Sequence, residues 1–198
     1  MNKDNQEIEI KIKLDDPEAL YERALSFGGE ELKEKEGLEH DVMYDDGKGF
    51  FDAFKVLRLR TAPFGNLLTY KEKNQGSDQD HFLVRTEIET YVTDAKAMDE
   101  IIQKLEFVPY RIKEKYVRKI RLQEMILEFH KLPFIGEFIE IEGDKADVEK
   151  MVNKLNLDIN SGINRDYTSL FHEYCDDHNL PRITPQTFEA ESTIAKNK

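Results

Sequence analysis

The chain has 198 residues, of which 39% are hydrophobic and 35% are charged, and its formal net charge at pH 7 is −12. This length suits one domain with its own core, or at most two small ones, and the plentiful aromatic and β-branched residues argue against a largely disordered chain. The negative charge argues against DNA or RNA as a bulk partner, although a small anion could still bind in a basic pocket.

Cysteine content and hydropathy bear on the cellular compartment. The single Cys175 cannot form an internal disulfide, and no run approaches the roughly 18 apolar residues of a membrane span. The N-terminus shows no charged-then-apolar leader. We therefore expect a cytoplasmic protein that does not associate with membranes.

The tripeptide Glu-Ile-Glu begins at Glu7, Glu87 and Glu140, each time within an alternating stretch. In the first copy, alternation predicts a strand with the two glutamates and Lys11 on one face and the isoleucines on the other. Aspartates and helical periodicity follow each copy, which predicts helices over residues 16–27, 94–105 and 144–155. The chain thus repeats one strand-then-helix unit three times.

The remaining elements fall between these repeats. Strands are expected near residues 41–45, in a hairpin at 56–60 and 68–73, and in a pair at 115–122 and 125–130. A last helix begins near Tyr167, and the polar residues after it show no clear period, so we expect a loosely attached tail. The pattern indicates an α+β protein with antiparallel pairing, organised as a domain at 1–175 and a polar C-terminal tail at 176–198.

The predicted strand faces carry many charges, and these are segregated by sign. Acids dominate the first and last Glu-Ile-Glu strands, whereas bases dominate the hairpin between them. A merely solvated sheet face would more naturally mix signs on each strand, because cross-strand pairs then neutralise locally. The alternative is that the sheet curls closed with the charged faces inside.

These charges suggest a chemistry. Carboxylates without sulfur or clustered imidazoles favour Mg²⁺ or Mn²⁺, and a neighbouring wall of arginine and lysine suits a polyphosphate. A metal that bridges carboxylates and phosphate is the usual arrangement for displacement at phosphorus. The residues therefore point to a site for a metal and a polyphosphate.

An ordered set of motifs resembles the CYTH superfamily of triphosphate tunnel metalloenzymes, and within it the class IV adenylyl cyclase-like branch. Glu7-x-Glu9-x-Lys11 matches the N-terminal signature of that family, which alone is short and weakly specific. The later motifs follow in the family's order: Leu57-Arg58-Leu59-Arg60, Tyr70-Lys71, Arg85-x-Glu87, Glu114-Lys115, Gly136-x-Phe138-x-Glu140-Ile141-Glu142 and Arg165-x-Tyr167. The likeness covers residues 7 to about 175.

The resemblance implies an eight-stranded antiparallel β-barrel that forms an open tunnel with a charged interior and helices outside. It implies a divalent metal, Mg²⁺ or Mn²⁺, held by Glu7, Glu9, Glu140 and Glu142. It also implies triphosphate binding by Lys11, Arg58, Arg60, Lys71, Arg85 and Lys115. Glu87 is expected to brace the basic residues.

Two positions depart from the family pattern. The family usually has an aspartate about six residues before Gly136, where this chain has His130, and Glu128 lies one pleat earlier on the same face. Either could be the missing metal ligand, and we favour Glu128. Arg118 stands one residue away from the family's basic position, so it is expected to face the side of Tyr116 and Ile120 unless the strand bulges.

The reading we favour is a metal-dependent hydrolase that removes the terminal phosphate of a triphosphate such as ATP, tripolyphosphate or thiamine triphosphate. Lys11 could act as a catalytic base there if its pKa were depressed, although the nearby carboxylates would oppose that shift. One alternative is a class IV adenylyl cyclase that converts ATP to cyclic AMP and pyrophosphate. A non-catalytic binder of polyphosphate or nucleotide is the third. A homodimer remains open, without a sequence feature that supports it.

Overall fold

A computed structural model describes residues 6–50, 53, 55–73 and 82–196, with the side chains at 6, 7, 73, 82 and 83 outside the described part. Its elements are, in chain order, β1 (Gln6–Leu14), α1 (Pro17–Ser26), β2 (Glu30–Glu31), η2 (Lys33–Lys35), β3 (Gly37–Asp45), β4 (Lys55–Ala62), β5 (Gly65–Lys73), β6 (Phe82–Val92), α2 (Ala95–Lys104), β7 (Val108–Leu122), β8 (Met125–Leu132), β9 (Gly136–Glu142), α3 (Lys145–Lys154), η3 (Ile159–Ser161), α4 (Tyr167–Asp177) and α5 (Phe188–Lys196).

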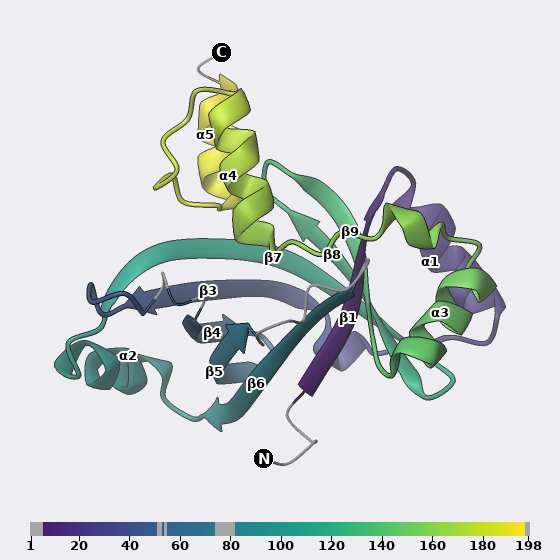
Figure 1. Cartoon of the computed structure of the whole chain (residues 1–198), viewed down its shortest axis with the longest axis horizontal. Coiled ribbons are helices and arrows are strands. Elements are labelled where there is room, and N and C mark those ends of the chain that lie inside the picture. Colours follow the sequence, from purple (N-terminus) through teal and green to yellow (C-terminus); the bar gives the residue numbers. More distant parts are fainter. Residues whose placement is uncertain (1–5, 51–52, 54, 74–81, 197–198) are drawn as a thin grey trace.

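Eight of these strands close an antiparallel barrel (Figure 1). Their order is β7-β3-β4-β5-β6-β1-β9-β8, and the pairing of β7 with β8 completes the ring. The short β2 pairs with β7 beyond the end of β3, where Glu31 lies opposite Ile120. The predicted α+β class and eight-stranded barrel are therefore confirmed.

The alternation of β1 separates an outer core face from an inner face. Ile10 and Ile12 are buried in a cluster that contains residues of α1 and α3, whereas Lys11 between them lines the inside of the barrel. Burying each such apolar side chain contributes roughly 1.5–3 kcal/mol. Because α1 and α3 cover this outer face (Figure 1), the charged faces of the same strands point inward.

Two further helices cover other parts of the barrel. Ile102 of α2 packs against Tyr44 of β3 and Leu59 of β4. Tyr167 and Phe171 of α4 pack in a second cluster with Phe138 of β9, so the start of α4 lies against the barrel.

The C-terminal residues differ from the expected loose tail. Helix α5 lies alongside α4 in Figure 1, and Gln186 is fully buried. Gln186 pairs with the backbone of β7: the amide of Glu114 donates to the Gln186 carbonyl at 2.8 Å, and the amide of Gln186 donates to Ile112 at 3.1 Å. The prediction failed because this attachment uses polar and backbone contacts, while α5 has no buried residue whose period could be read.

No helix in the described residues is long and apolar enough to cross a membrane.

Candidate active site

The barrel contains a cavity of about 1100 Å³, and most of the residues that line it are charged. That volume exceeds the usual size of pockets for small molecules, so a triphosphate with an attached organic group would fit. Every predicted site residue with a described side chain lines it: Glu9, Lys11, Arg58, Arg60, Lys71, Arg85, Lys115, Glu128, Glu140 and Glu142. Glu7 was also predicted as a metal ligand, but its side chain lies outside the described part of the chain.

Strand register brings the acids together on one side of the cavity. Glu140 of β9 lies opposite Lys11 of β1 on one flank and opposite Glu128 of β8 on the other. Glu142 lies opposite Glu9 one pleat further along. Directly opposed residues on neighbouring strands project from the same face of the sheet, so these side chains share the interior.

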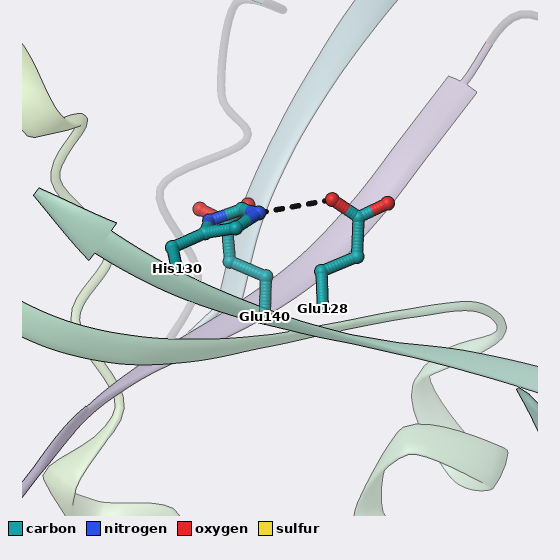
Figure 2. A group of neighbouring side chains, drawn as sticks. All are labelled: Glu128, His130 and Glu140. Carbon is teal, nitrogen blue, oxygen red and sulfur yellow. Dashed lines mark hydrogen bonds and ion pairs between the residues drawn. The ribbon is translucent and has the colours of Figure 1, made fainter. Parts of the chain in front are cut away.

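Glu128, His130 and Glu140 form a compact group, shown in Figure 2, in which one ligand atom from each residue lies within 4.8 Å of the others. Nε2 of His130 is 3.0 Å from Oε2 of Glu128, and Nδ1 is 3.3 Å from Oε2 of Glu140. Tyr167 of α4 reaches the same imidazole, with its hydroxyl 3.0 Å from Nδ1. Both candidates for the family's aspartate therefore belong to one group.

The protonation states in this group suit a cation. Burial alone would raise the pKa of Glu128, but its contact with His130 and the charges of Lys119 and Lys115 hold that pKa well below its usual range. Burial likewise opposes ionisation of Glu140, yet Lys11, His130 and Lys115 lower its pKa. Burial lowers the pKa of His130 and Lys115 pushes it the same way, so the imidazole is neutral near pH 7. Two carboxylates and a neutral imidazole are a donor set that a divalent cation can accept.

Lys11 is the phosphate-binding candidate that contacts the acids of β1 and β9 directly. Its Nζ lies 3.0 Å from Oε1 of Glu140 and 3.3 Å from Oε1 of Glu9. Burial would lower the pKa of Lys11, but the charges of Glu140 and Glu9 outweigh it and the pKa is raised. Lys11 is therefore an ammonium ion at neutral pH, and the depressed pKa that a base would need is not found.

Arg58 and Arg60 of β4 form a basic surface of the cavity, which we call the basic wall. They contact acids of β3 that the sequence interpretation missed. Asp41 lies opposite Arg60 in the register and accepts from its Nε at 2.7 Å and its Nη2 at 3.0 Å. Nη1 of Arg58 is 3.7 Å from Asp41, and Nη1 of Arg60 is 2.8 Å from the buried Glu39. Alternation could have placed both acids on the inner face of β3, but the pairing of β3 with β4 cannot be read from periodicity.

Lys113 of β7 is a second residue that the sequence interpretation missed. It is 6% exposed, lines the cavity one pleat before Lys115, and its Nζ lies 3.6 Å from Oδ2 of Asp41. Burial lowers its pKa to about 7, and the charges of Lys115 and the two wall arginines act in the same direction, while Asp41 opposes them. Lys113 is thus a wall lysine whose charge changes near neutral pH.

The other basic residues also have acidic partners. Nζ of Lys71 lies 2.6 Å from Oε2 of Glu87, which is 3.9 Å from Arg58 through its other oxygen, so Glu87 braces the basic residues as expected. Nη2 of Arg85 is 3.4 Å from Asp166 at the start of α4.

Arg118 lies outside the cavity. Its Nη2 is 2.6 Å from Glu18 of α1, and its guanidinium stacks 4.1 Å from the centre of the Tyr21 ring. The prediction that it faces the side of Tyr116 and Ile120 is confirmed.

A comparison with protein families shows to which family the chain belongs. The family model described as the CYTH domain matches residues 5–167. The chain belongs to the CYTH family. Members of this family are metal-dependent enzymes that act on triphosphates, and the donor set of Glu128, His130 and Glu140 fits a divalent cation.

Individual relatives agree with this assignment. A candidate adenylate cyclase of Methanocaldococcus jannaschii is 27% identical over 150 residues, which cover 73% of this chain and 80% of the relative. The structure of a candidate adenylate cyclase of Vibrio parahaemolyticus has a TM-score of 0.70 at 16% identity and covers 84% of this CYTH chain and 97% of its own. A Hippeastrum structure, described as a candidate adenylyl cyclase with a dominant triphosphatase activity, has a TM-score of 0.61 at 18% identity, with coverages of 85% and 95%. At these identities the two structures show a shared fold.

Proposed function

We propose that this CYTH protein is a divalent-metal-dependent triphosphatase that hydrolyses the terminal phosphate of a nucleoside triphosphate or of tripolyphosphate. One observation carries the proposal: a group of ionised acids and a wall of fixed cations line one cavity, in which the ammonium ion of Lys11 lies against the acids. This is the charge distribution that a metal-bound triphosphate needs. The Hippeastrum protein, described as having a dominant triphosphatase activity, supports the choice of hydrolysis.

Some residues of the chain would hold the metal and others would bind the phosphate oxygens. A bound metal would neutralise phosphate charge and polarise the reacting phosphorus. Glu9, Glu140 and Glu142, with Glu128 or His130 and with Glu7, are the residues that would hold it. Arg58, Arg60, Lys71, Arg85 and Lys115 would bind phosphate oxygens, and the buried acids behind the arginines keep their guanidinium groups in place before the substrate arrives.

We assign Lys11 to phosphate binding. Because its ammonium group is already protonated, it can donate to a phosphate oxygen but cannot take a proton from water. Phosphoryl transfer through a loose transition state depends mainly on positioning and charge stabilisation, so this assignment does not weaken the site.

Phosphorus NMR tests the proposal. The purified protein is incubated with ATP, and separately with tripolyphosphate, in Mg²⁺ and then in Mn²⁺, with Glu140→Gln as the inactive variant. Orthophosphate released by the wild type and not by the variant is the expected result.

Two other results would overturn the proposal. Pyrophosphate with a cyclic-phosphate signal from ATP would establish the cyclase, the activity for which the Methanocaldococcus jannaschii relative is named. Chemical shifts that move on binding without any turnover would leave a binding protein.

A further inference from the structure

The acidic group contains a nitrogen donor, His130, whose surroundings are unlike those of a surface histidine. The side chain is fully buried between two ionised carboxylates, which Figure 2 shows, and it also contacts the hydroxyl of Tyr167. Each ring nitrogen has a different set of neighbours, and those neighbours decide which nitrogen is available to a metal.

Nδ1 faces two groups that can accept a hydrogen bond. The Tyr167 hydroxyl lies 3.0 Å from Nδ1, and Oε2 of Glu140 lies 3.3 Å from it. A ligating histidine generally donates its second ring N–H to a carboxylate or a similar group, which fixes the tautomer and the ring orientation. Glu140 and Tyr167 are placed to do this for His130.

Nε2 faces a carboxylate and a cation. Oε2 of Glu128 and Nζ of Lys115 each lie 3.0 Å from Nε2. When Nδ1 carries the proton, Nε2 cannot donate to Glu128, and its lone pair and Oε2 of Glu128 are two acceptors 3.0 Å apart beside the ammonium group of Lys115. A cation bound by both acceptors would take the position of that ammonium group. Lys115 has a second partner in Glu39, 3.3 Å from its Nζ, and can therefore give up this contact.

The identity of the donors then bears on the metal. Mg²⁺ is bound through oxygen ligands, whereas the transition-metal ions Mn²⁺ and Co²⁺ also accept a nitrogen ligand, Co²⁺ more strongly than Mn²⁺. We infer that Nε2 of His130 is a ligand in this site beside Glu128, and that the site consequently prefers Mn²⁺ and Co²⁺ to Mg²⁺. The inference rests on the proposed metal requirement and adds the nitrogen ligand and the resulting metal preference.

Pulsed electron paramagnetic resonance on the Mn²⁺-loaded wild-type protein tests the ligand directly. Modulation from a directly bonded ¹⁴N nucleus is expected, both without substrate and with tripolyphosphate. It should disappear in His130→Asp and persist in His178→Gln, which changes an exposed histidine at the end of α4. The wild-type spectrum decides the question even if the buried His130→Asp variant folds poorly.

Equilibrium competition supplies a second readout. The ratio of the Mg²⁺ and Mn²⁺ dissociation constants should fall by roughly tenfold or more in His130→Asp, because an oxygen ligand replaces the nitrogen. An unchanged ratio in a folded variant would contradict the inference.

Failure of the inference can be told apart from failure of the proposed function. If Mn²⁺ binds and supports phosphate release without ¹⁴N modulation, His130 is only a positioning residue and the inference is wrong, while the proposed function stands. If neither Mn²⁺ nor Mg²⁺ binds with or without tripolyphosphate, both are overturned.

Discussion

The basic wall and the acidic group occupy the same barrel but are held together differently. In the wall, Arg60 donates two hydrogen bonds to Asp41 and forms an ion pair with Glu39. Both acids are almost completely buried behind it. In the acidic group, Glu140 is paired with Lys11, and Glu128 with Lys119, through single ammonium groups on flexible stems. Arginine forks are pre-organised, whereas a lysine ammonium is a point charge that can change partners.

The difference separates stability from function within one cavity. The arginines are fixed before any ligand arrives, so the wall belongs to the folded structure itself. The lysines beside the carboxylates already neutralise charge that a metal would neutralise, so their contacts can be exchanged on binding. Substitutions of the buried acids behind the wall should therefore act mainly on folding, and substitutions in the acidic group mainly on ligands.

The largest effect is expected for Asp41→Asn. The amide keeps the shape of the side chain but leaves Arg58, Arg60 and Lys113 without their shared buried charge. Breaking a buried ion pair costs about 3–5 kcal/mol, so the free energy of unfolding in urea should fall by about that amount. The control, Glu106→Gln, removes an exposed partner of Lys48 and should leave the unfolding curve unchanged. Equal stability of both variants would show that the wall does not depend on Asp41.

Lys11→Gln should change ligand binding in two opposite directions. Loss of a positioned charge on the phosphate should lower kcat/KM by roughly 100-fold. Loss of a competing cation beside Glu9 and Glu140 should at the same time tighten Mn²⁺ binding in the absence of substrate. Steady-state phosphate release and Mn²⁺ titration measure the two effects.

Lys13→Gln is the matched control for that experiment, because Lys13 lies on the same strand but is exposed and outside the cavity lining. Both quantities should stay at their wild-type values in this variant. Weaker Mn²⁺ binding by Lys11→Gln would contradict the view that the ammonium group of Lys11 competes with the metal for the carboxylates.

A smaller effect concerns pH. The pKa of Lys113 is lowered to about 7, so the side chain is charged below that pH and neutral above it. Bound triphosphate favours the charged form and raises the pKa, so the loss of charge on Lys113 weakens the binding of metal-free tripolyphosphate as the pH rises from 6 to 9. The loss is at most about tenfold for each unit by which the ligand raises that pKa.

Lys113→Arg removes this titration and also corrects for the protons that tripolyphosphate itself loses. The wild-type dissociation constant, measured by calorimetry, should therefore rise relative to that of the variant as the pH increases. Profiles of equal slope would mean that Lys113 does not face the ligand. The groups around Lys113 are Asp41 on β3, the arginines of β4, Lys115 on its own strand and the Tyr167 ring of α4, 5.6 Å from Nζ.

The smallest effect is expected for Arg118→Ala. Because Arg118 pairs with Glu18 on the outside of the barrel, kcat/KM should match that of the wild type. A clear loss of activity would place this side chain in the tunnel and contradict its position in the register.

Alternation predicted which side chains share the cavity but not which of them contact each other. The positions of Glu9, Lys11 and Glu140 follow from the period of two along their strands. Asp41 was within reach of the same argument, yet its role depends on the register of β3 against β4, which joins residues far apart in the sequence. Lys113 was missed because β7 begins at Val108, several residues before the start that its alternating pattern suggested.

The two backbone hydrogen bonds between Gln186 and β7 bear on where this chain can be truncated. The family match ends at residue 167, but hydrogen bonds from Gln186 hold the β7 backbone on both sides of Lys113. Trimming the chain to the boundary that homology suggests would remove helix α4 after its first residue and expose an edge of β7. The hydrogen bonding of β7 therefore extends to residues beyond the end of the family match.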